Sequence, residues 1–143
     1  MKKKLLAIFL LAAMMLLAFA ACSNEVAQQG YAFADKTYLY QGEGYGGGAF
    51  YIVLRSDGNF SYKEGNGTDY LASGTWVYEN GVLSLTDTLN GSDRKIVNNF
   101  FYVDGNLWYL TENSSGFPYA KVSEGELFVF AYDNAPAPEI TEE

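Results

Sequence analysis

Short apolar runs alternate with Gly, Asn and Asp along most of the chain, and Gly74–Thr86 is the clearest example. Its Asn80-Gly81 pair predicts a two-residue type I′ turn, because both central positions of that turn need a positive φ. With this turn Trp76 lies opposite Leu85, so that large apolar side chains share one face. A two-stranded ribbon cannot bury such a face by itself, and the hairpin therefore predicts a larger sheet.

The turn at Ser56-Asp57-Gly58 can be assigned from the pattern on either side of it. A two-residue loop would mix polar and apolar residues on both faces of the hairpin. A three-residue loop, with Gly58 in the left-handed region, instead pairs Leu54 with Phe60. Since a slip of one residue moves every side chain to the other face, the pattern predicts the three-residue loop.

The rest of the body follows the same hairpin pattern, and no long segment after the first twenty residues shows the i, i+3, i+4 repeat of a helix. The hairpin around Asp104-Gly105 has aromatic residues on both faces, which leaves its register open. The sequence predicts an all-β fold, an antiparallel meander of about 8–9 strands that closes into a small barrel and so removes its exposed edges. Further strands are predicted at Thr37–Gln41, Lys95–Val103, Asn106–Thr111, Pro118–Val122 and Glu126–Tyr132.

The amino end has the parts of an export signal. Three lysines precede an unbroken apolar run from Leu5 to Ala21, as in a secretory signal peptide. The only cysteine of the chain, Cys22, follows Ala20-Ala21 directly. This junction resembles the lipobox of bacterial lipoproteins, in which the cysteine is acylated and becomes the first mature residue. The resemblance implies a signal-peptide helix, which is then removed, and a lipid anchor on Cys22.

These patterns predict four parts of the chain and a location for it. Several acyl chains hold a protein durably at a membrane. We therefore expect an extracytoplasmic lipoprotein, anchored to the cell membrane or the outer membrane of a bacterium. The four parts are the signal peptide (1–21), the lipidated cysteine and a flexible tether (22–36), the β-barrel domain (37–132) and a disordered acidic tail (133–143).

The composition excludes some partners and some kinds of catalytic and metal site. The chain has 9 basic and 17 acidic side chains, and loss of Lys2, Lys3 and Lys4 with the signal would change its formal net charge from −8 to −11. Such an acidic body repels nucleic acid, so no nucleic-acid partner is predicted. The chain contains no histidine, which removes the usual base of nucleophilic catalysis and a usual zinc ligand. No catalytic residue, metal or cofactor is predicted.

The body resembles small bacterial lipoproteins with a lipocalin-like barrel domain, of the META-like or NlpE-like kind. Copper-associated members of that group carry a Cys-x-x-Cys pattern, which this chain lacks, so no thiol metal site is carried over. Lipocalins have Gly-x-Trp on their first strand, whereas Gly74-Thr75-Trp76 lies in the middle of this chain, so their ligand pocket is not implied. The resemblance rests on the patterns Ile52-x-Leu54, Asp57-Gly58-x-Phe60, Gly74-x-Trp76 and Leu83-x-Leu85.

Aromatic side chains at the rim of a barrel can stack on a sugar or on another apolar ligand. Packing into the core is the alternative for every such residue. Gly42–Gly48 lacks the Lys-Ser or Lys-Thr pair of a phosphate-binding loop, and we expect a flexible connection there. The candidate ligand-binding residues are Tyr40, Tyr45, Tyr51, Tyr70 and Trp108.

The leading functional hypothesis is a non-enzymatic, membrane-anchored binding or envelope-associated module, with a protein, a glycan or a small apolar molecule as its partner. One alternative is a carboxylate-based hydrolase acting on glycans, which would need two acidic side chains facing each other across a cleft. The other is a structural interaction protein without a small-molecule pocket. An exposed aromatic patch would favour contact with a protein or a glycan.

Overall fold

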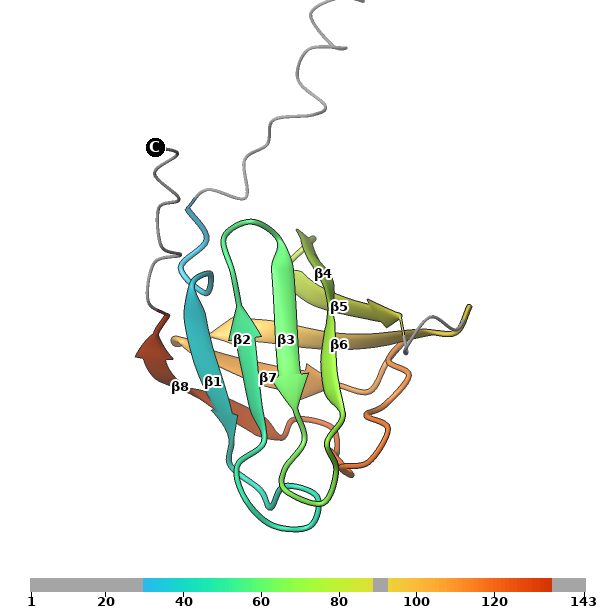
Figure 1. The fold of residues 1–143 in the computed structure, drawn as a ribbon. Helices are drawn as coiled ribbons and strands as arrows, with labels where there is room; N and C mark the ends of the chain where they lie inside the picture. The colour runs from blue at the N-terminus through green and yellow to red at the C-terminus, as the bar shows by residue number, and fades with distance from the viewer. Residues whose placement is uncertain (1–29, 89–92, 135–143) are drawn as a thin grey trace, which may run out of the picture.

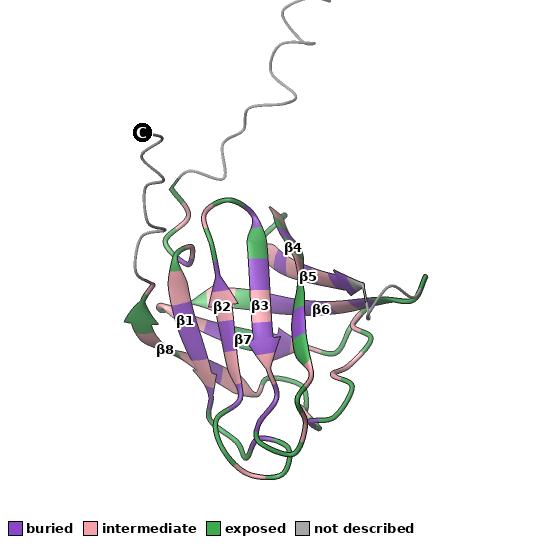
Figure 2. Cartoon of the chain, in the orientation of Figure 1, coloured by how far each residue is buried: buried purple, intermediate pink, exposed green. Residues whose placement is uncertain are grey.

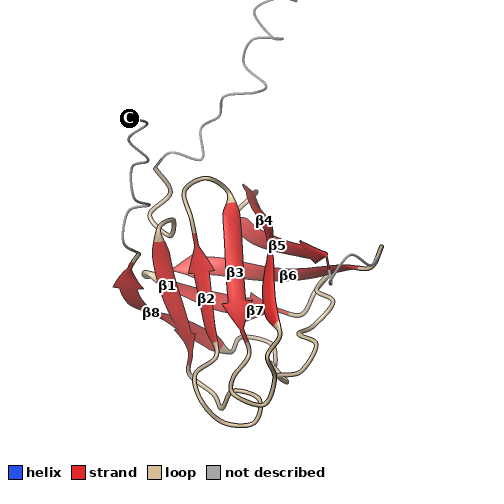
Figure 3. Ribbon diagram, viewed as in Figure 1, coloured by secondary structure: helices blue, strands red, loops and turns tan. Residues whose placement is uncertain are grey.

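Eight antiparallel strands form a closed barrel in the computed structural model, which describes residues 30–88 and 93–134 (Figure 1). Each strand pairs with the next, and β8 returns to pair with β1. The described residues contain no helix (Figure 3). The predicted all-β meander and its closure into a barrel are confirmed. The strands are β1 (Lys36–Tyr40), β2 (Tyr51–Leu54), β3 (Asn59–Lys63), β4 (Leu71–Glu79), β5 (Val82–Thr88), β6 (Lys95–Val103), β7 (Asn106–Leu110) and β8 (Leu127–Asp133).

Both registers that the sequence predicts are confirmed. Leu54 on β2 pairs with Phe60 on β3, and Trp76 on β4 pairs with Leu85 on β5. The Asn80-Gly81 turn has φ values of 53° and 83°, as a type I′ turn requires. Turn chemistry and apolar alternation together therefore specify these two hairpins.

The hairpin of β6 and β7, whose register the sequence left open, uses the same kind of turn. Asp104-Gly105 has φ values of 51° and 81°. This turn pairs Phe100 with Tyr109 on the inner face and Phe101 with Trp108 on the outer face. Aromatic residues thus occupy both sides of this part of the sheet.

The predicted last hairpin is wrong in its first strand. Pro118–Val122 forms no strand, and β7 pairs directly with β8. The backbone N–H groups of Tyr119 and Ala120 donate hydrogen bonds to the Glu64 carboxylate instead of to a neighbouring strand. The segment from 111 to 126 is a long loop at one end of the barrel.

Large side chains fill the interior of the barrel. Inward and outward positions alternate along the strands, which Figure 2 shows as changes between purple and green or pink. Near the centre the ring of Phe128 lies 5.0 Å from that of Phe50 and 5.5 Å from that of Phe100. The buried apolar side chains of the strands are Tyr38, Tyr40, Ile52, Leu54, Phe60, Tyr62, Ala72, Trp76, Leu83, Leu85, Ile96, Phe100, Leu107, Tyr109 and Phe128.

The seam between β1 and β8 closes the barrel. Its register shifts between Thr37 and Tyr38, which marks an irregularity in the ladder. On the outside, the Lys36 ammonium lies 2.9 Å from the Asp133 carboxylate and 4.8 Å from the centre of the Phe130 ring. These contacts join the first strand to the last.

One end of the barrel, at the top of Figure 1, is closed by the residues that precede β1. Phe33 is buried, and its ring lies 5.3 Å from that of Trp76 and 5.4 Å from that of Tyr102. Tyr31 stacks on Phe33 at 5.0 Å. We call this the plugged end. The described part of the expected tether therefore packs against the barrel, while the predicted signal peptide, Cys22 and tail residues 135–143 lie outside the described residues.

Candidate functional site

Three tyrosines from three different loops meet at the other end of the barrel, at the bottom of Figure 1. The ring of Tyr119 lies 5.5 Å from the ring of Tyr45 and 5.8 Å from the ring of Tyr70. Tyr45 and Tyr119 each expose 44% of their surface. We call this group the tyrosine platform and this end of the barrel the tyrosine end.

The loop between β1 and β2 places Tyr45 by pairing with the loop between β3 and β4. The Tyr45 backbone N–H donates to the Glu64 carbonyl at 2.6 Å, and the Tyr45 carbonyl accepts the Gly67 N–H at 2.8 Å. Gly65 has a φ of 132°, and a Cβ there would lie 2.4 Å from the Tyr45 carbonyl oxygen. Only glycine fits this close approach. The expected flexible connection is instead held by main-chain hydrogen bonds.

A fully buried carboxylate holds the loop that carries Tyr119. Glu64, directly after β3, has no exposed surface. Its Oε2 accepts the Tyr119 N–H at 2.8 Å and also the Ala120 N–H. Burial raises the pKa of the Glu64 carboxyl, and the two N–H groups offset part of that rise. A residue far away in the sequence thus fixes the backbone under the platform.

A second buried carboxylate holds Tyr70. Asp87, at the inner side of β5, is 2% exposed and accepts a hydrogen bond from the Tyr70 hydroxyl. Burial, followed by this hydrogen bond, raises the pKa of Tyr70. The hydroxyl of Tyr70 therefore points towards buried Asp87, which orients the ring.

The core beneath the platform contains buried polar groups among its aromatic rings. The Tyr109 hydroxyl donates to Asn98 Oδ1 at 2.9 Å. Glu64 Oε1 and the Tyr62 hydroxyl are buried without a hydrogen-bond partner. The pKa of Tyr62 is raised, mainly by burial and next by the charge of Glu64. The carboxylate of Glu64 and the phenols of Tyr62 and Tyr109 are thus enclosed by the fold, beneath the exposed rings of the platform.

The other predicted site residues do not join the platform. Tyr40 lies in the core, where its hydroxyl donates to Glu126 at 2.6 Å and burial raises its pKa to about 12. Tyr51 is half-buried on β2, next to Leu39 of β1. Trp108 is 41% exposed on the outside of β7. The structure brings together Tyr45 and Tyr70 from the predicted set and adds Tyr119.

Sequence reasoning missed Tyr119 and the two buried carboxylates. Tyr119 lies in Pro118–Val122, which was predicted to be a strand, and Glu64 and Asp87 are not among the predicted site residues. The short spacing between Tyr62 and Glu64 was a usable signal, because alternation from the inward Tyr62 places Glu64 on the same side of the strand.

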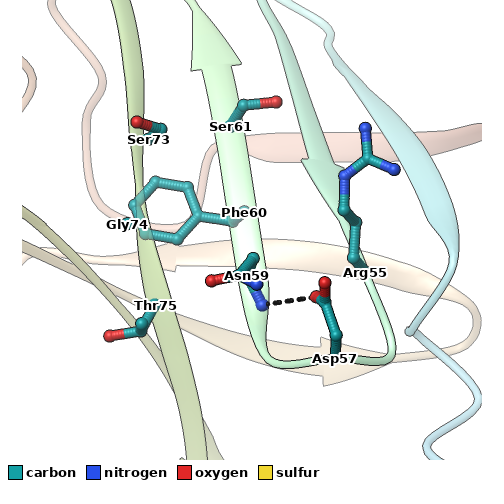
Figure 4. Close-up of a pocket in the computed structure, with 8 residues that line it drawn as sticks. All are labelled: Arg55, Asp57, Asn59, Phe60, Ser61, Ser73, Gly74 and Thr75. Carbon is teal, nitrogen blue, oxygen red and sulfur yellow. Dashed lines mark hydrogen bonds between the residues drawn. The ribbon is translucent and has the colours of Figure 1, made fainter.

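An open depression of about 480 Å³ lies on the outer surface of β3 and β4 (Figure 4). Asp57 Oδ1 accepts the Asn59 N–H at 2.9 Å, and hydrogen bonds from Asn59 lower the pKa of Asp57. Asp57 is the only carboxylate in the lining of this depression. The lining residues are Arg55, Asp57, Asn59, Phe60, Ser61, Ser73, Gly74 and Thr75.

Two smaller depressions lie elsewhere on the surface of the barrel. One, between β6, β7 and β8, is lined by Lys36, Asp104 and aromatic residues, and the other, beside Phe117, has no carboxylate. Within residues 30–88 and 93–134, no group of three or more His, Cys, Asp or Glu side chains could hold a metal ion. None of these three depressions has two carboxylates facing each other.

Comparison with models of protein families, with curated proteins and with solved structures gives no match to this chain. In the part of the chain that the structure describes, no helix is both long and apolar enough to cross a membrane.

Proposed function

We propose that this protein is a non-enzymatic, saccharide-binding lipoprotein, held outside the cytoplasmic membrane by a lipid on Cys22. The observation that carries the proposal is the tyrosine platform, in which Tyr45 and Tyr119 present exposed rings from loops with fixed backbones. The face of an aromatic ring packs against the C–H face of a sugar, and the tyrosine hydroxyl can hydrogen-bond at its edge. Rings that are already in place lose little conformational entropy on binding.

The positions of the two ends support this arrangement. The chain enters the barrel at the plugged end, through Tyr31 and Phe33, whereas the platform lies at the opposite end (Figure 1). A lipid anchor upstream of Tyr31 would therefore attach on the side away from the platform. The bound glycan would be one that stands off the membrane, such as a polymer of the cell envelope.

The negative net charge of the chain limits the kinds of saccharide that it can bind. The chain carries a formal net charge of −8, or −11 without its first 21 residues. An acidic body disfavours polyanions such as nucleic acids and teichoic-acid-like polymers. A neutral or amino-sugar chain fits the platform better.

The state of the carboxylates favours binding over hydrolysis. A glycoside hydrolase needs one carboxylic acid and one carboxylate on opposite sides of a bound sugar. Glu64 and Asp87 are buried; Glu64 already accepts two backbone N–H groups and Asp87 the Tyr70 hydroxyl. We therefore propose that they support the platform rather than act on a substrate.

Calorimetric titration of the purified full chain with chito-oligosaccharides, cello-oligosaccharides and soluble peptidoglycan fragments tests the platform. Tyr45→Ala and Tyr119→Ala should each weaken binding by about tenfold, which corresponds to one lost stacking contact. Tyr132→Ala is the matched control, because Tyr132 is 59% exposed on β8 and takes no part in the platform. Binding that is unchanged in both platform variants, or absent for every sugar, would refute the saccharide proposal.

The anchor needs a separate test. Cys22→Ala should abolish incorporation of labelled fatty acid and release the protein from the membrane fraction. If Cys22→Ala still sediments with membranes, the lipid-anchor proposal is wrong, whatever the outcome of the sugar titrations.

A further inference from the structure

The tyrosine platform lies above buried negative charge. Among the residues that the structure describes, the buried charged side chains are Glu64, with no exposed surface, and Asp87, which is 2% exposed. Glu64 accepts the Tyr119 N–H, and Asp87 accepts the Tyr70 hydroxyl. Each buried carboxylate is therefore one hydrogen bond away from a residue of the platform. The plugged end also gathers aromatic rings, but its described residues include no buried carboxylate.

One oxygen of the Glu64 carboxylate has no partner. Oε2 accepts two backbone N–H groups, while Oε1 is buried without a hydrogen bond, so no lysine or arginine side chain donates to it. The Tyr62 hydroxyl is likewise buried without a partner. A buried carboxylate without a cationic partner costs free energy, and a positive charge bound nearby would lower that cost. The fold thus leaves part of a buried negative charge beneath the platform without a hydrogen-bonded partner.

The rings of the platform suit a positive charge. The face of an aromatic ring attracts an ammonium group that lies within about 6 Å of its centre. The ring centres of Tyr45 and Tyr119 are 5.5 Å apart, and those of Tyr70 and Tyr119 are 5.8 Å apart. One ammonium group can therefore lie close to two rings. Because the Tyr70 hydroxyl donates to a carboxylate, its ring gains electron density, which strengthens the attraction.

We propose that the platform selects saccharides with free, protonated amino groups over saccharides that carry acetamido or hydroxyl groups at the same positions. This inference rests on the proposed saccharide binding and adds the charge of the ligand to it. The C–H face of one sugar unit packs on the ring of Tyr45 or Tyr119, and the ammonium group lies against a neighbouring ring. Such a ligand also complements the net charge of −8 of the chain.

The buried carboxylates act on this ligand through space. Glu64 has no exposed surface, so an ammonium group on the platform does not bond to it. At an effective dielectric constant of about 20, a charge about 10 Å away changes an affinity by about tenfold. Glu64 and Asp87 therefore set the preference for a charged ligand without touching it.

Calorimetric titration of the purified full chain with three β-1,4-linked trisaccharides tests this preference. The trimers of glucosamine, N-acetylglucosamine and glucose differ at C2, where they carry an ammonium, an acetamido or a hydroxyl group. At low salt, and at a pH just below the pKa of the ligand's amines, the glucosamine trimer should bind about tenfold more tightly than either neutral trimer. This ratio should fall at about 1 M salt, where the screening length is about 3 Å.

Glu64→Gln removes one buried charge and keeps an oxygen that can accept the two N–H groups. The ratio of the affinities for the glucosamine and glucose trimers should fall by about threefold or more in this variant, and also in Asp87→Asn, which is the second test. The ratio is the readout, because a structural change in the platform weakens both ligands together. Glu79→Gln is the matched control, since it removes an exposed carboxylate beside Tyr78 at the plugged end, and it should keep the ratio of the unsubstituted chain. Circular dichroism checks that each variant is folded.

The outcomes separate this inference from the proposed function. Equal affinities for the three trimers, tighter binding of a neutral trimer, or an unchanged ratio in both buried-charge variants would overturn the charge preference and leave saccharide binding standing. Binding of no trimer would refute saccharide binding and this inference with it.

Discussion

The two ends of the barrel are closed by opposite kinds of chemistry. At the plugged end Phe33 packs among the rings of Tyr31, Trp76 and Tyr102. Polar side chains there act only at the edge of this cluster, where the Tyr38 hydroxyl donates to the Phe33 carbonyl and the Trp76 indole N–H donates to the Arg55 carbonyl. At the tyrosine end, buried Glu64 holds a long loop through directed hydrogen bonds.

The two kinds of contact contribute differently: apolar packing mainly stabilises the fold, and hydrogen bonds to a buried carboxylate mainly fix the positions of the groups that they join. Apolar burial stabilises in proportion to area and depends little on direction. A buried carboxylate contributes less net stability because it loses its hydration, but its hydrogen bonds hold the donors in a defined geometry. The plug therefore suits an end that only has to stay closed. The polar end suits one that has to present side chains in fixed positions.

The largest expected effect is at the plugged end. Phe33→Ala should lower the free energy of unfolding by about 4 kcal/mol, because it leaves a cavity among buried rings. Urea titration followed by tryptophan fluorescence measures this, since Trp76 lies beside the cavity. A loss below about 1 kcal/mol would show that residues 30–35 do not plug the barrel in solution.

Glu64→Ala is the corresponding change at the tyrosine end. We expect a loss of about 3 kcal/mol, since two backbone N–H groups lose their acceptor. Unlike Phe33→Ala, it should also release the loop that carries Tyr119, which faster amide exchange at 119 and 120 would show. Glu64→Gln is the control, because its amide oxygen can still accept both bonds. Equal exchange rates in the Ala and Gln variants would show that the hydrogen bonds to Glu64 do not hold this loop.

The pH dependence of stability distinguishes the ends further. Burial raises the pKa of Glu64 in the folded state, so the folded protein binds this proton more tightly than the unfolded chain does. The contribution of Glu64 to stability therefore falls as the pH rises from the unfolded value of about 4.5 through the raised folded pKa. The free energy of unfolding of Glu64→Gln minus that of the unsubstituted chain should increase over this range. A difference that stays constant between acidic and neutral pH would refute this prediction.

Turn chemistry explains why much of the fold could be predicted. Asn80-Gly81 and the Leu54/Phe60 alternation each fix a register from residues close in sequence. Asp104-Gly105 is a turn of the same kind as Asn80-Gly81. The register of the β6–β7 hairpin was nevertheless left open, because aromatic residues on both faces gave no apolar alternation to choose by.

The site could be predicted less well, because distant contacts build it. Nothing near Pro118 in the sequence indicates that the following N–H groups bond to Glu64, 55 and 56 residues away. Trp108 and Tyr70 are both aromatic residues near turns, yet one lies on the side of the barrel and the other at its end. Alternation assigns a face of the sheet, but not which loops converge.

The smallest expected effect on stability belongs to the platform. Tyr119→Ala should change the free energy of unfolding by less than about 1 kcal/mol, because the ring is exposed and its loop is held through the backbone. Urea titration beside Phe33→Ala tests this, and a loss as large as that of Phe33→Ala would make Tyr119 a core residue. A small loss together with weakened sugar binding would separate its two possible roles.

The seam between β1 and β8 has a consequence for how the molecule is made. Lys36 and Asp133, which meet across it, are 97 residues apart. As the chain is synthesised, β1 can pair with β2 early, but its other edge has no partner until the last strand emerges. Pairings of such long range slow folding, and an open edge can pair with other chains in the meantime. A chain that stops before Leu127 would keep two open edges and should aggregate.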